Sequence, residues 1–190
     1  MKIALLRSAV FAAALGLGTL GQANAATYTT LDTEKSKVTF SYSQMNVDMT
    51  GGFSEIKATE LNFDPANAAA AKVKLEIALK GVDAGNPDAN SELAKNEWLN
   101  TTAHPLATFT SKKVTATGDN KFDVLGDLSI KGNTRELTVP VTLKQDNNSG
   151  LFEGQFKFQR ADFGIGEGQW KDFSIVANEI VVKFSLVANP

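Results

Sequence analysis

The sequence predicts an all-β protein, an eight-stranded antiparallel β-barrel with one short helix. Three observations support this fold class. Apolar and polar residues alternate with a period of two over most of the chain, which places every second side chain on one face of a strand. Short turn-forming sequences separate the alternating segments. Only one segment, 87–99, has helical spacing instead. A two-sheet β-sandwich would show the same alternation and stays open as the alternative.

The first 25 residues have the organisation of a cleavable secretory signal peptide. Lys2 and Arg7 carry the only charges, an apolar run follows over 9–17, and an Ala-Asn-Ala sequence ends at Ala25. The apolar run of about a dozen residues is shorter than the roughly 20 that a membrane-spanning helix needs. We therefore expect cleavage after Ala25 or Ala26, export to the periplasm and no integral membrane segment.

Residues 26–190 have the length of one domain, and their composition excludes several classes of function. The chain has 19 basic and 21 acidic residues, and the signal peptide removes two of the basic ones. This mildly acidic balance argues against a nucleic-acid partner, which needs a basic stripe. The absence of cysteine excludes disulfides, thiol catalysis and cysteine-ligated metals.

Eight segments are predicted to be strands of the barrel. They are Val38–Ser43, Phe53–Phe63, Val73–Lys80, Ala107–Val114, Phe122–Ile130, Leu137–Lys144, Phe152–Gln159 and Ile180–Leu186. Turn-forming residues such as Asp64-Pro65, Gly118-Asp119-Asn120 and Gly132-Asn133 lie between strands. The short spacers late in the chain favour antiparallel hairpins.

The segment Pro87–Leu99 is predicted to form the one short helix. Asp88 is a plausible N-cap, and Leu93 and Ala94 fall on a common face with Glu97 and Trp98 at helical spacing. A further helical turn is possible at Ala66–Ala71.

Residues for conventional catalysis or metal binding are few. His104 is the only histidine, it precedes a proline, and no Gly-x-Ser-x-Gly sequence presents a serine nucleophile. One histidine without cysteine is a poor basis for a zinc site. Asp162 and Glu167 lie near each other in the sequence, but carboxylates beside a glycine-rich loop are usually solvated or capping. The glycine-rich segment 164–168 lacks the Lys-Ser/Thr ending of a phosphate-binding loop. We predict no catalytic residue, no metal site and no cofactor.

The aromatic and aliphatic residues on inward-facing strand positions are the candidate ligand contacts. Such residues also fill ordinary cores, but an eight-stranded barrel has room for one small apolar ligand along its axis. The candidates are Phe40, Tyr42, Phe53, Ile77, Trp98, Leu99, Phe109, Val139, Phe156, Phe158, Phe163, Trp170 and Phe184.

Short motifs in a fixed order resemble those of the YceI family of bacterial periplasmic proteins. They are Ser36-x-Val38-x-Phe40, Gly52-Phe53, Phe63-Asp64-Pro65, Val82-Asp83-Ala84-Gly85, Trp98-Leu99, His104-Pro105-x-Ala107-Thr108-Phe109-x-Ser111, Gly126-Asp127-Leu128-Ser129-Ile130-Lys131-Gly132-x-Thr134 and Arg160-x-Asp162-Phe163-Gly164. Together they extend over essentially the whole chain after the signal peptide.

The resemblance implies a lipocalin-like antiparallel barrel that holds a long apolar chain and performs no catalysis. The chain would be a polyisoprenoid, an isoprenoid quinone or a fatty-acyl lipid, bound for storage or transport. Two positions depart from the family pattern: Gln44 stands where many members have histidine, and Ala89-Asn90 where many have Arg-Asp. We therefore expect chain binding to persist and the preference for a head group to differ.

Two other functions remain open on the sequence alone. A barrel completely filled by side chains would suit a structural or stress-response partner, and a hydrolase or isomerase would use the interior as an active site. We expect the protein to be a monomer or a homodimer.

Overall fold

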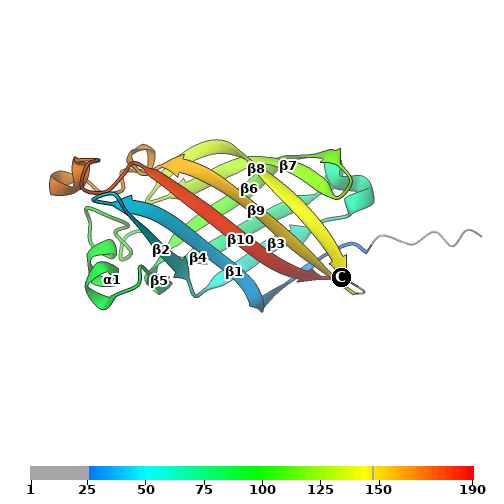
Figure 1. The fold of residues 1–190 in the computed structure, drawn as a ribbon. Helices are drawn as coiled ribbons and strands as arrows, with labels where there is room; N and C mark the ends of the chain where they lie inside the picture. Colours follow the sequence, from blue (N-terminus) through cyan, green and yellow to red (C-terminus); the bar gives the residue numbers. More distant parts are fainter. Residues whose placement is uncertain (1–25, 147) are drawn as a thin grey trace, which may run out of the picture.

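The computed structural model describes residues 26–146 and 148–190, which form one antiparallel sheet of ten strands that curls into a barrel (Figure 1). The predicted signal peptide and Ala25 lie outside these residues. The strands are β1 (Thr30–Gln44), β2 (Val47–Phe53), β3 (Ile56–Asn62), β4 (Lys72–Ala78), β5 (Val82–Asp83), β6 (Leu106–Gly118), β7 (Lys121–Ile130), β8 (Asn133–Asp146), β9 (Ser149–Gln159) and β10 (Glu179–Asn189). The strand order is β3-β4-β6-β7-β8-β9-β10-β1-β2-β5.

The predicted all-β barrel is confirmed, with ten strands in place of eight. All eight predicted segments are strands, and β2 and β5 are additional. The strand β2 was missed because Gly51-Gly52 interrupts its alternation, and β5 because it has only two residues.

The segment that contains β2 and β3 closes the barrel. β2 pairs with β1 near one end of the strand order, whereas β3 pairs with β4 at the other end. Only Ser54 and Glu55 separate the two strands, so the chain passes directly from one edge of the sheet to the other. The backbone groups of Tyr28 and Phe63 add a reciprocal pair of hydrogen bonds of 2.8 and 3.0 Å. These bonds join the segment before β1 to the end of β3.

Glycines on strands next to phenylalanines make space for the rings in the barrel wall. Gly154 of β9 pairs with Phe184 of β10, and a Cβ atom at residue 154 would lie 2.5 Å from Cζ of that ring. In the same way, a Cβ at Gly126 would lie 2.6 Å from Cζ of Phe109. Because such contacts are too short for real atoms, both positions need glycine for the rings to take their places.

The only α-helix among the described residues, α1 (Pro87–Leu93), is shorter than the predicted helix. Its N-cap is Asn86, whose side chain accepts a hydrogen bond from the N–H of Ala89 at 2.8 Å, so the prediction of Asp88 as N-cap was wrong. Proline is favoured at the first helical position, which makes the preceding residue the cap. The residues from 94 to 99 form turns instead of continuing the helix.

A second helical turn is present where the sequence allowed one. Residues Pro65–Ala70 form a 3₁₀ segment, and the side chain of Asp64 accepts a hydrogen bond from the N–H of Ala66 at 2.8 Å.

The two ends of the barrel differ in their contents. Figure 1 places α1 and the segment 160–178 at one end, and the C-terminus together with the start of β1 at the other. An edge-to-face aromatic cluster fills the second end: Phe63 contacts Phe122 and Phe152 with ring centroids 5.0 Å apart, and Tyr28 contacts Phe152 at 5.3 Å.

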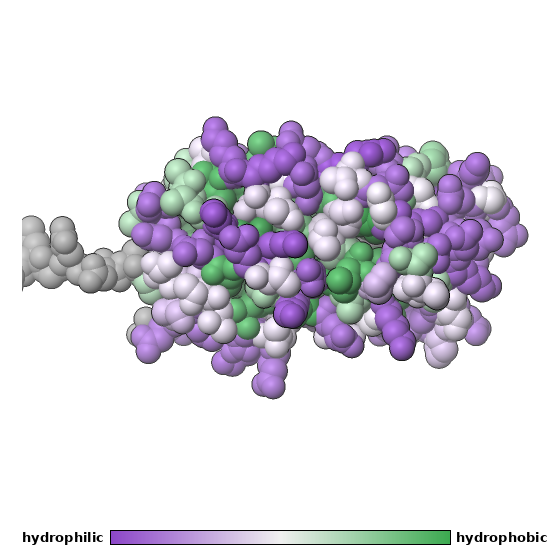
Figure 2. Space-filling model, turned by 180° about the vertical axis from the view of Figure 1, so that it is seen from behind, coloured by the Kyte–Doolittle hydropathy of each residue, from purple (hydrophilic) through white to green (hydrophobic). Residues whose placement is uncertain are grey.

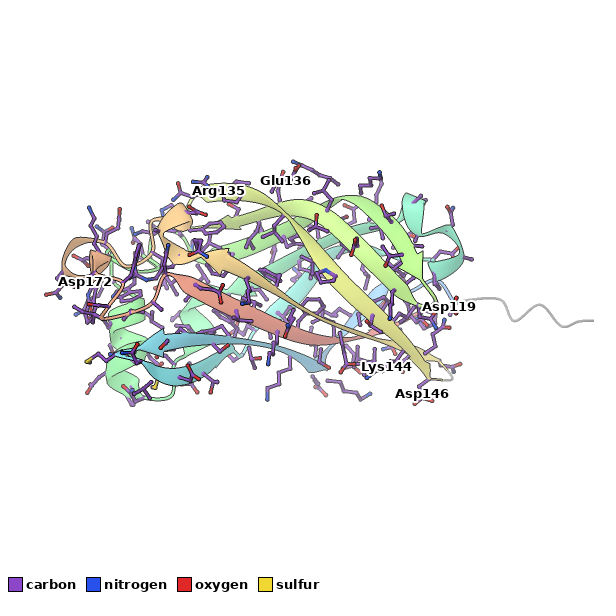
Figure 3. The ribbon with its side chains drawn as sticks, turned by 45° about the horizontal axis from the view of Figure 1, so that its top comes forward. Asp119, Arg135, Glu136, Lys144, Asp146 and Asp172 are labelled. Carbon is purple, nitrogen blue, oxygen red and sulfur yellow. The ribbon has the colours of Figure 1, made fainter. Side chains whose placement is uncertain are left out.

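The outer face of the barrel is polar. Hydrophilic side chains cover most of the face shown in Figure 2, with apolar residues interspersed among them. On β8, the charged residues Glu136 and Lys144 project outward (Figure 3). Glu136 pairs with Lys112 at 2.9 Å, and Lys144 with Glu153 at 2.6 Å. The alternation along the strands therefore places charge outside and apolar side chains inside.

Candidate ligand-binding cavity

A cavity of about 600 Å³ lies inside the barrel, between the aromatic cluster and the α1 end. All ten strands contribute to its wall, and α1 contributes four side chains. Its volume falls in the usual range of small-molecule sites, about 300–1,000 Å³. The interior of this barrel is therefore not filled by its own side chains.

The strand register brings the inward-facing residues of neighbouring strands together. Val38 and Phe40 of β1 lie opposite Phe184 and Val182 of β10, and all four line the cavity. The same period of two continues along β1 to Tyr42. Alternation in the sequence thus becomes a continuous apolar wall because adjacent strands place the same parity inward.

Every predicted ligand contact except Phe163 lines the cavity. These lining residues are Phe40, Tyr42, Phe53, Ile77, Trp98, Leu99, Phe109, Val139, Phe156, Phe158, Trp170 and Phe184. Their contact with a ligand stays a prediction.

Phe163 is buried outside the lining, behind Phe158. Its ring meets that of Phe158 edge to face, with centroids 5.1 Å apart. Phe163 lies in the 3₁₀ segment Arg160–Phe163 after β9 has ended, so strand parity does not apply to it. Its position supports the cavity wall from outside.

The polar lining residues that sequence reasoning missed gather at the α1 end. They are Asn86, Asp88, Glu92 and Arg160, together with Gln44, which was noted only as a departure from the family pattern. Gln44 is placed there by a backbone bridge to Val176. The rest of the wall is apolar apart from Thr108, so the cavity has one polar end and a long apolar body.

Glu92 and two tryptophans form the core of the polar end. The indole N–H of Trp170 donates a hydrogen bond to Oε1 of Glu92 at 3.0 Å, and the ring centroids of Trp98 and Trp170 are 5.4 Å apart. Glu92 also accepts a hydrogen bond from Lys95. The bond from Lys95 lowers the pKa of the Glu92 carboxyl most, partial burial opposes it, and the bond from Trp170 lowers it further. Glu92 is therefore ionised at neutral pH.

Arg160 is almost completely buried, 1% exposed, and holds the segment that covers this end. Its five N–H groups donate to the backbone carbonyls of Ile165, Gly166, Trp170, Val176 and Ala177 at 2.7–3.1 Å. All five acceptors are backbone carbonyls, and the nearby carboxylate of Asp162 is not among them. Its guanidinium carbon lies 5.6 Å from the centre of the Trp98 ring, and burial lowers the pKa of Arg160. A guanidinium has five donors, so none is left for a ligand.

Residues considered for catalysis lie away from the cavity. His104, which precedes β6, lies beside Gly132, a residue of the turn between β7 and β8. Glu167 forms an ion pair with Lys131 at 3.0 Å. Neither residue lines the cavity. Within 26–146 and 148–190, no group of three or more His, Cys, Asp or Glu side chains could hold a metal ion. None of the helices in these ranges is long and apolar enough to cross a membrane.

Known proteins share this fold and much of this sequence. The chain is 33% identical over 172 residues to a UPF0312 protein of Azotobacter vinelandii, covering 85% of this chain and 88% of that protein. The crystal structure of Burkholderia cenocepacia BcnA superposes with a TM-score of 0.81 at 40% identity, covering 84% of this chain and 99% of the other.

A more distant structure has the same fold. It is a domain from Saccharophagus degradans, described as a polyisoprenoid-binding domain implicated in plant cell wall breakdown, with a TM-score of 0.69 and 17% identity over 86% of this chain and 99% of that one. The model of the YceI-like domain matches residues 29–188. The chain therefore belongs to the YceI-like domain family.

Proposed function

We propose that this protein is a non-catalytic periplasmic binding protein that holds one long apolar chain in its barrel. The chain is a polyisoprenoid, an isoprenoid quinone or a fatty-acyl lipid, and it is bound for storage or transport. The observation that carries the proposal is the cavity of about 600 Å³ with its almost entirely apolar wall. A barrel that served only as a structural partner would have no need of this space.

The shape and polarity of the cavity suit an amphiphile. Its apolar body lies between the sheet walls, and its polar residues, Glu92 and Gln44 among them, lie at the α1 end. We infer that the tail lies along the barrel axis and that the head group lies near α1. The described polyisoprenoid-binding role of the Saccharophagus domain, which shares the fold, supports a ligand of this kind.

The energetics of apolar binding set a lower limit on the length of the chain. Each buried methylene contributes about 0.8 kcal/mol, whereas association costs an estimated ~4–15 kcal/mol. A ligand held mainly by apolar contacts therefore needs on the order of ten or more buried carbons. This favours a chain of several isoprene units or a fatty-acyl tail over a short metabolite.

Mass spectrometry of lipid extracts tests the proposal. Protein purified from the periplasm without detergent should release about one long-chain molecule per folded barrel into organic solvent. An equal amount of an unrelated periplasmic protein, purified in parallel, controls for carried-over membrane lipid. Extracts without a stoichiometric chain would contradict the proposal and favour a structural role.

A further inference from the structure

We propose that the indole N–H of Trp98 donates a hydrogen bond to a neutral oxygen, a hydroxyl or a carbonyl, on the head group of the bound chain. This inference rests on the proposed function, and it names the group that selects among chains of equal length.

The N–H of Trp98 is an orphaned donor beside the cavity. Trp98 is 7% exposed and lines the cavity wall. Its Nε1 is buried and has no hydrogen-bond partner among the residues that the structure describes, and it is the only buried side-chain nitrogen or oxygen there in that condition. Buried N–H groups in native proteins nearly always have an acceptor, so an acceptor from a ligand would complete this one.

The neighbouring Trp170 has the hydrogen-bond acceptor for its indole N–H that Trp98 lacks. The ring of Trp170 lies tilted against that of Trp98, with centroids 5.4 Å apart, and its N–H donates a hydrogen bond to Glu92. The remaining oxygen of Glu92 accepts the hydrogen bond from Lys95. Trp98 lies close enough to contribute the smallest of the effects that lower the pKa of Glu92, but its N–H does not meet either oxygen in hydrogen-bonding geometry. Each oxygen of this carboxylate accepts one hydrogen bond from another donor, and neither accepts one from Trp98.

The charges at this end favour a neutral acceptor over a phosphate. Two carboxylates, Asp88 and Glu92, line the polar end and would repel an anion. Arg160 is the one cation in the lining, and its five donors are all bound to backbone carbonyls. A phosphate would find no free charged donor there. An alcohol or a carbonyl needs only one N–H, and Trp98 has it.

Three probes with 20-carbon isoprenoid chains separate the head-group contact from the tail contacts: geranylgeraniol, geranylgeranyl phosphate and the hydrocarbon phytane. Dissociation constants are measured by native mass spectrometry on delipidated full-length mature protein. The variant Trp98→Phe keeps an aromatic ring and removes the N–H. Trp170→Phe is the matched control, because it removes an N–H that already has a partner.

The wild-type protein should bind geranylgeraniol more tightly than phytane or the phosphate. Because a neutral hydrogen bond contributes about 0.5–1.5 kcal/mol, Trp98→Phe should weaken geranylgeraniol binding by roughly 2- to 10-fold and leave phytane binding within about 2-fold. Trp170→Phe should change the affinities for geranylgeraniol and for phytane by similar factors. An equal loss of affinity for geranylgeraniol and for phytane in Trp98→Phe would overturn the inference. So would tighter binding of geranylgeranyl phosphate than of geranylgeraniol by the wild type.

The outcome for phytane distinguishes this inference from the proposed function. If the wild type binds phytane and the alcohol equally well, the chain-binding function stands and the head-group contact fails. If it binds none of the three probes, both fail.

A second measurement needs no variant at position 98. The chain has two tryptophans, so a ¹⁵N-labelled sample gives two indole N–H signals, and Trp170→Phe assigns them. Geranylgeraniol should move the Trp98 signal downfield relative to phytane. Identical spectra with the two probes would contradict the proposed bond.

Discussion

The indole N–H of Trp170 donates a hydrogen bond to the Glu92 carboxylate, 3.0 Å away, and so joins the 3₁₀ segment Gly168–Lys171 to helix α1. The two residues are 78 positions apart in the sequence. Arg160 holds the same segment from inside through the carbonyl of Trp170. The polar end of the cavity is therefore built from a helix and a loop that interact through side chains.

The variant Glu92→Gln should lower the melting temperature modestly at neutral pH and much less near pH 3. The hydrogen bond from Lys95 and the weaker one from Trp170 hold the pKa of Glu92 below its ordinary value of 4.5. A carboxyl with a depressed folded-state pKa stabilises the fold above its unfolded-state pKa, and this contribution is lost as the pH falls through the folded-state value. Thermal unfolding of both proteins at the two pH values measures the effect. Glu97→Gln, at an exposed residue nearby, is the control. A difference of the same size at both pH values would contradict the role of ionised Glu92.

Replacing Arg160 by lysine should destabilise the protein by about 3 kcal/mol or more. The change leaves several buried carbonyls without donors, and each unsatisfied buried group costs about 1–3 kcal/mol. Lysine has three donors on a flexible stem and cannot reproduce the planar fork. Urea unfolding gives the free energies. The matched control is Arg135→Lys, at an exposed arginine of β8, which should stay within about 0.5 kcal/mol of the wild type. Equal stability of the two variants would show that the carbonyl contacts of Arg160 contribute little.

Phe158→Ala should cost less stability than the ~3–5 kcal/mol that removal of a packed phenylalanine usually costs. Phe158 lines the cavity, so open space or a ligand already adjoins part of its ring. Phe122 is the control, because it is buried in the aromatic cluster and does not line the cavity. Phe122→Ala should lose the full ~3–5 kcal/mol in the free energy of unfolding, measured by denaturant titration. If the two variants lose the same free energy, Phe158 is ordinary core.

Export can be tested on the mature N-terminus. The small residues that end at Ala25 predict that periplasmic protein begins at Ala26, or at Thr27 if cleavage follows Ala26. N-terminal sequencing of protein released by osmotic shock checks this. Recovery of the full-length chain from washed membranes would contradict cleavage and favour an uncleaved anchor.

Much of the fold was predictable because strand parity is a local property. In β10, for example, Val182, Phe184 and Leu186 alternate with the polar residues Lys183 and Ser185, and all three apolar residues line the cavity. The strand β2 escaped prediction because Gly51 and Gly52 carry no side chain to show a parity. At Gly51 the absence of a side chain is itself required, since the ring of Phe40 occupies the space that a Cβ atom would take.

The polar end of the cavity was not predictable in the same way. Arg160 and Phe163 follow the end of β9, where the chain leaves the sheet, and their positions depend on tertiary contacts with the loop 165–177. Glu92 lies on a helix of only seven residues whose face toward the barrel is set by its cap and by Trp170. No periodicity in the sequence encodes such contacts.

The most direct test of the central claim compares the wild type with Phe158→Trp, a variant that adds bulk to the cavity wall. Both proteins are purified from the periplasm without detergent, and the amount of extracted long-chain molecule per folded barrel is measured by mass spectrometry. If the cavity holds the chain, the wild type should yield about one molecule per barrel, and the folded variant should yield much less or a shorter chain. A folded variant that carries the same chain in the same amount would contradict the account, because the chain would then be bound somewhere other than in this cavity.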